Sequence, residues 1–297
     1  MPDPKFTVVV PTRDRPRALQ ACLEATRRLT GPRSGREVVV VDDGSRVPVE
    51  PGEGWRVVRL EGRGPAAARN AGARAARGQW LAFTDDDCRP RPGWLDALAA
   101  RLEANPGALV GGCTVNALTS NPWSSASQLL VDWLYAWPEA RPEAGRIFTT
   151  SNLAVAREPF LAAGGFDEAF SAPGAEDREL CERWAARGGA LVHAPEAVVD
   201  HEHVLDALAF WHQHVRYGRG TRRLWRRGGE QGYRHGLHPP AFYAGMLNYP
   251  FRRKRGDAWA QAALLVLAQV ANVAGFASEW MEERCGDGAP GGDLLSA

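Results

Sequence analysis

Two apolar runs, "VVVVDDGS" (residues 38–45) and "LAFTDDDC" (residues 81–88), lead directly into adjacent aspartates. Continuous runs of β-branched and apolar residues are typical of strands that are covered on both faces of a parallel sheet. The carboxyl ends of such strands meet at one edge of the sheet, where ligands bind. We therefore expect two acidic groups that are far apart in the sequence to converge on one crevice: Asp42 and Asp43, and Asp85, Asp86 and Asp87.

Strands and helices alternate through the first 115 residues. This pattern predicts an α/β fold with a mixed, mainly parallel sheet flanked by helices. The expected strands are 6–12, 37–45, 55–60, 79–87 and 108–115, and the expected helices are 15–29, 64–78 and 92–107.

The rest of the chain differs in composition. Residues 116–205 are rich in Trp, Ser, Gly and Pro, and we expect shorter elements there, including a strand pair in 190–203. From about residue 206 the sequence predicts a helical extension rich in Arg and Trp. We interpret 1–115 and 116–205 as two halves of one domain and 206–297 as a C-terminal helical extension.

Charge and cysteine content narrow the classes of function. The formal net charge of +1 gives no global field that would attract nucleic acid. The five cysteines are widely spaced, which argues against both a disulfide framework and a zinc ribbon. The apolar run near the N-terminus is too short for a signal peptide. These features predict a cytoplasmic protein.

The strand-end aspartates have a functional and a structural interpretation. Three adjacent carboxylates repel one another unless a cation or hydrogen-bond donors offset their charge, and hard divalent cations prefer oxygen ligands. The alternative for Asp85–Asp87 is a solvated turn that caps the next helix. Asp42 and Asp43 could accept hydrogen bonds from a base or a ribose, or they could form an ordinary Asx-turn.

Two further groups of side chains could act in catalysis or in ligand binding. Glu176 and Asp177 precede a helix, where they could supply a general base or only interact well with the helix dipole. His201 and His203 lie two residues apart on an expected strand and therefore share one face. They could bind a metal or a pyrophosphate, although a lone histidine is more often structural.

Taken together and in order, these stretches resemble glycosyltransferase family 2, which has a GT-A fold and inverts the sugar linkage. The matching stretches are "VVVPTRDRPRALQACLEA", "VVVVDDGS", "GPAAARNAGARAARGQWLAFTDDDCRPRPGWL", "GGFDEAF", "GAEDRELCERWAARG" and "HEH". The resemblance implies a nucleotide-diphosphate sugar donor, of which UDP is the commonest base, and Mg²⁺ or Mn²⁺ held at a DxD motif. It implies no nucleic-acid partner.

The resemblance also implies roles for individual residues. Asp177 would be the catalytic base, and Glu176 would orient the acceptor, which would be a carbohydrate, a lipid-linked molecule or another hydroxyl compound. Asp87, Asp85 and His201 would form the metal site. In this chain Asp86 stands where the family commonly has a small residue. The nucleotide-sugar site would comprise Pro11, Thr12, Arg13, Asp42, Asp43, Arg69, Asp85 and Asp86, and the loop beside the acceptor would comprise Gly164, Gly165 and Phe166.

Two other functions remain alternatives at this point. A sugar-nucleotide nucleotidyltransferase would carry a Gly-rich, Lys-containing N-terminal loop, and "VPTRDRPR" lacks both features. A catalytically silent binding protein of the same fold would not need the intact acidic set.

The C-terminal extension holds an uncharged stretch, residues 258–277, that is just long enough to span a bilayer. Its glutamines, asparagine and alanines make it weakly apolar. We therefore expect it to dock on the protein or to lie at the membrane surface, with Arg clusters against anionic lipid. This interpretation predicts peripheral membrane contact through residues 206–280, at the inner face of the membrane.

Overall fold

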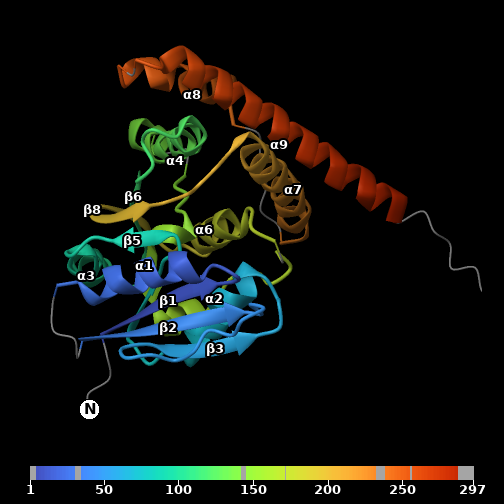
Figure 1. Ribbon diagram of the computed structural model, residues 1–297. Helices are drawn as coiled ribbons and strands as arrows, with labels where there is room; N and C mark the ends of the chain where they lie inside the picture. The colour runs from blue at the N-terminus through green and yellow to red at the C-terminus, as the bar shows by residue number, and fades with distance from the viewer. Residues whose placement is uncertain are drawn as a thin grey trace, which may run out of the picture.

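The computed structural model describes residues 5–30, 35–141, 145–170, 172–231, 238–254 and 256–286 (Figure 1). The strands are β1 (Phe6–Thr12), β2 (Arg36–Asp43), β3 (Arg56–Leu60), β4 (Trp80–Phe83), β5 (Cys88–Pro90), β6 (Leu109–Asn116), β7 (Leu153–Ala156) and β8 (Leu191–His201). The helices are α1 (Pro16–Arg27), α2 (Pro65–Ala75), α3 (Trp94–Ala104), α4 (Pro122–Ala140), α5 (Arg157–Ala162), α6 (Glu176–Ala186), α7 (Ala207–Gln231), α8 (Pro240–Arg252) and α9 (Ala258–Gly286), with a 3₁₀ turn at Thr150–Asn152.

All eight strands form one sheet in the order β3-β2-β1-β4-β7-β6-β8-β5. Pairs β1–β2, β1–β4, β2–β3 and β6–β8 are parallel, and pairs β4–β7, β6–β7 and β5–β8 are antiparallel. The sheet is therefore mixed and mainly parallel, as the sequence predicts. Because β1, β2 and β4 run side by side, the residues that follow them emerge at the same edge.

A hydrophobic core covers each face of the sheet, which explains why the central strands are apolar without alternation. On one face Val8, Val10, Val38 and Val40 pack with residues of α1 and α3. On the other face, Val9, Val39 and Val41 pack with α2, α5 and α6. The alanines of α2 allow this helix to lie close to β1 and β2.

Two expectations for residues 116–205 are wrong. The stretch 190–203 forms one strand, β8, and not a strand pair. Its register against β6 shifts between Gly112 and Cys113, so that Pro195 lies in a bulge where no ladder hydrogen bond from its nitrogen is needed. The region also contains a long helix, α4, whose start is capped by the Asn121 side chain through the Trp123 and Ser124 amides.

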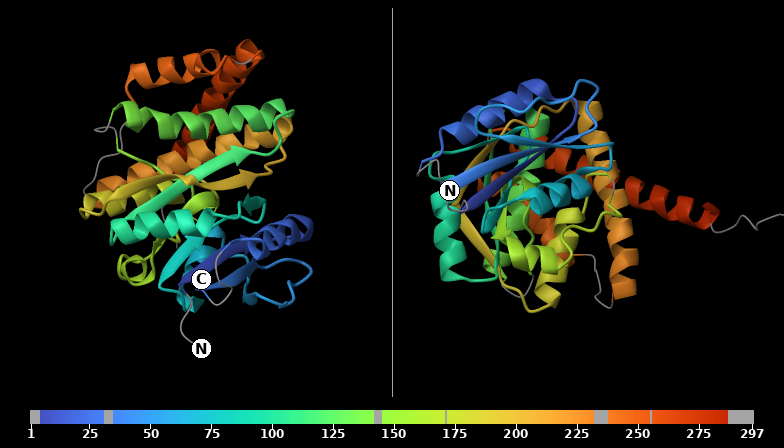
Figure 2. Two further views of the ribbon diagram at one scale, coloured as in Figure 1. Left: turned by 90° about the vertical axis from the view of Figure 1, so that its left-hand side faces the viewer. Right: turned by 90° about the horizontal axis from the view of Figure 1, so that it is seen from below.

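The C-terminal helices form a second layer with α4. Figure 1 shows α4, α8 and α9 stacked beyond β6 and β8, and Figure 2 shows the same layering from other sides. Leu129 and Trp133 of α4 pack with Phe242 and Met246 of α8 and Leu265 of α9. In α7, Phe210, Gln213, His214 and Leu224 are buried, whereas Leu208 is exposed.

Candidate active site

Asp42 and Asp43, at the end of β2, are held by backbone amides. The Asp42 carboxylate accepts hydrogen bonds from the Ser45 amide (2.8 Å) and the Val49 amide (3.1 Å). Although burial alone would raise its pKa, these bonds and the Arg59 guanidinium lower it. Asp43 accepts bonds from the amides of Arg63 (2.7 Å) and Gly64 (2.8 Å), and so ties β2 to the start of α2.

Asp85, Asp86 and Asp87 follow β4 and are held by side chains instead. Arg15, just before α1, donates to Asp86 Oδ1 (2.7 Å) and Asp87 Oδ2 (2.8 Å). The Thr12 hydroxyl at the end of β1 donates to Asp86 Oδ2 (2.7 Å). Asp85 is turned toward Arg69 of α2, whose Nη2 lies 2.7 Å from Asp85 Oδ1. Asp86 and Asp87 are therefore both buried and share Arg15, whereas Asp85 is partly exposed and pairs with Arg69.

The three carboxylates differ in protonation. Burial raises the pKa of Asp86 to about 7, because this cost exceeds the opposing effects of Arg15 and Thr12. Burial alone would also raise the pKa of Asp87, but the hydrogen bond and charge of His201, together with Arg15, hold it well below its ordinary value. A partly protonated Asp86 lessens the repulsion within the triplet.

Asp87 and His201 form a group with metal-ligand chemistry. His201 Nε2, at the end of β8, lies 3.3 Å from Asp87 Oδ1. Ligand atoms of Asp87, Cys88 and His201 all lie within 4.8 Å of one another. Of these donors, the carboxylate is the type that Mg²⁺ and Mn²⁺ prefer. The predicted ligand Asp85 lies outside this group, because its side chain pairs with Arg69. As predicted, His201 and His203 share one side, with ring centroids 5.0 Å apart.

Arg69 joins the two acidic groups of the site. This guanidinium is 4% exposed, and it pairs with Asp85 and, through Nη1, with Glu176 Oε1 at 3.1 Å. The neighbouring Asn70 bonds to the loop before α6 and not to the strand-end acids. Its side chain exchanges two hydrogen bonds with the backbone of Phe166, at 2.9 and 2.8 Å. α2 therefore contacts three parts of the site: Asp85 after β4, Glu176 at the start of α6, and the loop at Phe166 that precedes α6.

Glu176 and Asp177 open α6 after a strained turn. Ala175 has a φ of 72°, an uncommon conformation for a residue with a Cβ atom. Glu176 is buried, and its second oxygen accepts from the Gly174 amide at 2.7 Å. Asp177 is only partly buried and accepts one local bond, from the Arg178 amide at 2.7 Å. Burial, and then the Glu176 charge, raise the pKa of Asp177 to about 7.

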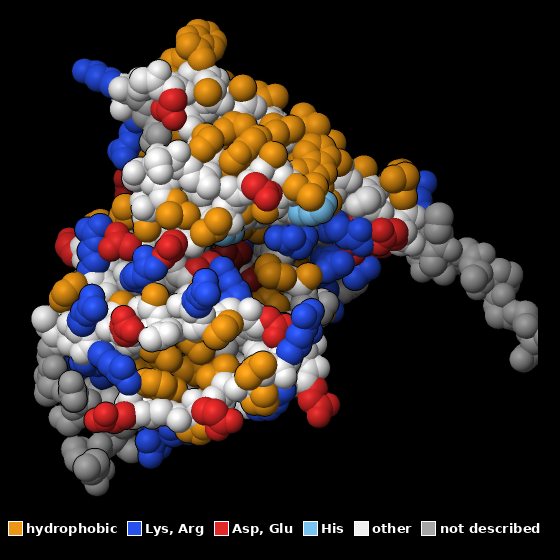
Figure 3. All heavy atoms as spheres, in the orientation of Figure 1, with side chains coloured by type: hydrophobic (Ala, Val, Ile, Leu, Met, Phe, Trp, Pro, Cys, Tyr) orange, Lys and Arg blue, Asp and Glu red, His pale blue; other side chains and the backbone are white. Residues whose placement is uncertain are grey.

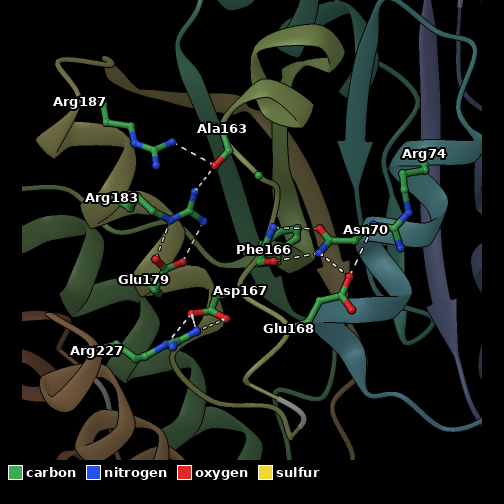
Figure 4. Close-up of a pocket in the computed structure, with 11 residues that line it drawn as sticks. Asn70, Arg74, Ala163, Phe166, Asp167, Glu168, Glu179, Arg183, Arg187 and Arg227 are labelled. Carbon is green, nitrogen blue, oxygen red and sulfur yellow. Dashed lines mark hydrogen bonds and ion pairs between the residues drawn. The ribbon is translucent and has the colours of Figure 1, made fainter. Parts of the chain in front are cut away.

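The predicted acceptor-side loop borders a pocket of about 420 Å³, seen in Figure 4. Gly164 and Phe166 line it, together with Arg183 of α6, Arg187 just after α6, and Arg227 of α7. The Phe166 ring itself is 1% exposed and packs against Phe83 and Phe160, so it supports the loop from beneath. Arg183 and Arg187 donate to the Ala163 carbonyl, which fixes the loop against α6.

The predicted residues at the end of β1 lie close to this edge. Pro11 is half-buried, Thr12 is buried, and Arg13 is exposed. The Arg13 guanidinium lies beside the backbone of Gly62, close to the loop that Asp43 holds. The structure thus gathers the ends of β1, β2 and β4 as expected.

Sequence reasoning missed Arg15 and Tyr217. Arg15 belongs to the "TRDR" stretch after the first strand, and a cation placed there opposite strand-end acids was the available signal. Tyr217 lies on α7, and the backbone of Tyr217 and Arg216 packs against Gly174. The surrounding protein and the negative charges of Asp177 and Glu176 raise the pKa of the Tyr217 phenol. Tyr217 lies neither at the end of a predicted strand nor in a recognised motif, so no feature of the sequence was a reason to select it.

Comparison with known sequences identifies related enzymes. The model of the family described as glycosyl transferase family 2 matches residues 7–162. A pre-mycofactocin glycosyltransferase of Mycobacterium tuberculosis is 34% identical over 208 residues, which cover 66% of this chain and 42% of the relative. A validoxylamine A glucosyltransferase of Streptomyces hygroscopicus is 28% identical over 232 residues, which cover 62% and 52%. The chain spans about half the length of these curated relatives.

Solved structures share the fold. A mannosyltransferase from Pyrobaculum calidifontis, in complex with GDP-Man and Mn²⁺, has a TM-score of 0.55 and 22% identity, covering 95% of this chain and 80% of that one. S. aureus TarS residues 1–349, in complex with UDP-GlcNAc, has a TM-score of 0.55 and 16% identity, covering 95% and 92%. At these identities the likeness concerns the fold alone.

Proposed function

Because this chain is a glycosyltransferase of family 2 with a GT-A fold, we propose that it is metal-dependent and transfers its sugar with inversion. The donor is a nucleotide-diphosphate sugar and the acceptor is a hydroxyl compound. The observation that carries this proposal is the bridge made by Arg69, which brings Asp85 of the strand-end group and Glu176 of the α6 group into one site.

The donor end of the site comprises the strand ends. Asp87, Asp85 and His201 would hold Mg²⁺ or Mn²⁺, and Pro11, Thr12 and Arg13 would lie near the base and ribose. When bound there, a divalent ion would offset the negative charge of the diphosphate leaving group. Because both oxygens of Asp43 already accept backbone bonds, its contact with the base would use their second lone pairs. Asp86 would support the site through Thr12 and Arg15.

The acceptor end comprises Asp177 and the loop at Gly164–Phe166. Asp177 takes the proton of the acceptor hydroxyl while that oxygen attacks the anomeric carbon from the face opposite the diphosphate, which inverts the linkage. Its partly buried position and a pKa of about 7 suit a general base, because about half of the carboxyl groups are deprotonated at neutral pH and the carboxylate is still basic. Glu176 holds Arg69 and the Gly174 turn, and so positions Asp177.

The nature of the donor base is the least constrained part of the proposal. We favour UDP because it is the family's commonest donor base, and the structural neighbours bind GDP-Man or UDP-GlcNAc. The acceptor is a carbohydrate, a lipid-linked molecule or another hydroxyl compound. The enzyme would work in the cytoplasm and contact the inner face of the membrane peripherally.

A panel of UDP- and GDP-sugars tests the proposal. The enzyme is incubated with each donor, a mixture of hydroxyl acceptors and Mn²⁺ or chelator, and free nucleoside diphosphate is measured. We expect release with one donor class and a loss of release with chelator. NMR of the product then gives the anomeric configuration, which should be opposite to that of the donor. Release of pyrophosphate in place of nucleoside diphosphate, or retention of configuration, would contradict the proposal.

A further inference from the structure

α9 carries an exposed apolar stripe along its outer side. The strongly exposed members are Trp259 (82%), Val266, Val270 and Val273 (69%). Their spacing of three, four and seven residues places them on one helical face. Figure 3 shows hydrophobic side chains gathered along α9 and α8 on this side of the molecule. We define the stripe as the exposed residues Trp259, Ala263, Val266, Val270, Val273 and Met281.

The inner side of α9 is fixed to the rest of the protein. α7 and α9 cross at Gly218 and Gly275, where a Cβ atom on either glycine would lie about 2 Å from a backbone oxygen of the other helix (1.9 and 2.0 Å). Further along, Arg223 of α7 makes two hydrogen bonds to Glu279 of α9, at 2.6 and 3.1 Å. The stripe therefore cannot turn inward without breaking this packing.

Among the described residues, the segment Ala258–Arg284 of α9 is long and apolar enough to cross a membrane, but one of its sides is buried inside the protein. Gln261, Leu265, Ala268 and Ala271 form that buried side. A helix held in this way can lie on a bilayer, but it cannot cross one while its inner side stays packed.

The charges at the two edges of the stripe indicate what covers it. Residues 258–278 contain no Asp, Glu, Lys or Arg, so no charged flank specifies a partner helix, as flanking charges do in coiled coils. Arg252, Arg253 and Lys254 are exposed at the turn into α9, and Asp257 follows them in the sequence. Trp259 stands beside them, with its ring 4.9 Å from that of Phe251. Tryptophan next to cations is typical of the membrane interface.

We propose that the stripe and the turn at Arg252–Lys254 form a docking surface for an anionic lipid bilayer. α9 lies in the plane of the interface, with the stripe in contact with acyl chains and the cations at the headgroups. α7 lies between α9 and the catalytic cleft, since it packs on α9 through Gly218 and on the Gly174 turn through Gly220. If the proposed transfer reaction is correct, docking brings the cleft close to acceptors that the membrane carries.

Vesicle binding tests this surface without any catalytic assay. The full chain is sedimented with vesicles of phosphatidylcholine alone or with phosphatidylglycerol. The wild type should bind anionic vesicles at least tenfold more tightly, and this preference should fall as salt rises. The double variant Val270→Glu/Val273→Glu should lose at least tenfold in binding. Arg252→Glu/Arg253→Glu should lose the preference for anionic lipid.

Val47→Glu is the matched control, because Val47 is 81% exposed on the opposite, nucleotide-binding part of the chain. It should bind vesicles as the wild type does, and circular dichroism should show all variants folded. The proposal would be overturned if the wild-type protein did not bind anionic vesicles, or if the stripe variant bound them as tightly as the wild type. The proposal would also be overturned if light scattering showed a wild-type dimer, the stripe variant were a monomer, and lipid had no effect on either protein. Vesicle binding without any nucleotide-sugar turnover would leave the docking surface intact and contradict the proposed function instead.

Discussion

The two strand-end acidic groups look alike in sequence and have different partners. Asp42 and Asp43 are bonded by four backbone amides, which belong to the fold itself. Asp86 and Asp87 are bonded by Arg15, a side chain that is 47% exposed. A backbone donor cannot leave without unfolding, whereas an exposed arginine can move aside for a ligand. The fold therefore fixes both side chains of the first group, and only the second lone pairs of Asp43 serve the proposed contact with the base. The partner of the second group, Arg15, can move to admit a ligand.

The largest expected effect concerns Asp177, the proposed general base. Asp177→Asn keeps the size and the bond from the Arg178 amide but cannot accept a proton. The transfer rate should fall by roughly two to four orders of magnitude, the usual contribution of a general base. Steady-state kinetics check the rate, and calorimetry with the donor should show little change in affinity. Near wild-type transfer by this variant would assign the base to another residue.

The structural role of the first group predicts an effect on stability. In Asp42→Asn an amide NH₂ replaces an oxygen that accepts from Val49 and Arg59, so donors would face each other. Urea unfolding should show a loss of about 1–3 kcal/mol. Since the pKa of Asp42 is lowered in the fold, its contribution is present above its unfolded pKa and is lost as pH falls toward the folded pKa.

The control for Asp42 is Asp96→Asn. Asp96 is exposed on α3 and accepts a single bond from the Thr30 hydroxyl. Its substitution should change stability by less than about 0.5 kcal/mol. If both variants changed the free energy of unfolding equally, Asp42 would have no special role in stabilising the end of β2.

A smaller effect is expected from pH. Asp177 must be deprotonated to act, and burial beside Glu176 raises its pKa to about 7. The value of kcat/KM should therefore rise about tenfold per unit as pH increases toward 7 and then level off. Asp86 titrates in the same range, and Asp86→Asn should keep this rise whereas Asp177→Asn should lose it. A profile that is flat from about pH 5.5 to 8 would contradict the assignment.

Sequence patterns predicted the sheet well because its strands are apolar and its helices are bounded by Gly and Pro. They also predicted that the strand-end acids would converge, since parallel topology requires it. α4 was missed although Asn121 and Pro122 are ordinary start signals, because its Ser- and Trp-rich sequence and Pro138 obscure the helical period. In β8, Pro195 suggested a break between two strands, whereas the chain absorbs it in a bulge.

The part of the site that could not be read from sequence depends on contacts between distant segments. Arg69 reaches Asp85 and Glu176 from α2, over 16 and 107 residues. Asn70, one residue later, serves the Phe166 loop instead. The backbone of α7 at Arg216 and Tyr217 packs against Gly174, just before α6. Local spacing carries no information on such pairs, since tertiary packing decides them.

Metal-dependent nucleotide binding tests the central difference between the two acidic groups most directly. Calorimetry measures the affinity for UDP and GDP, with and without Mn²⁺, in the wild type, Asp87→Asn and the folded control Asp96→Asn. We predict that Mn²⁺ strengthens binding of one nucleotide at least tenfold in the wild type and the control, and has no effect in Asp87→Asn. An undiminished Mn²⁺ effect in Asp87→Asn would contradict the assignment of the second strand-end group as the metal site.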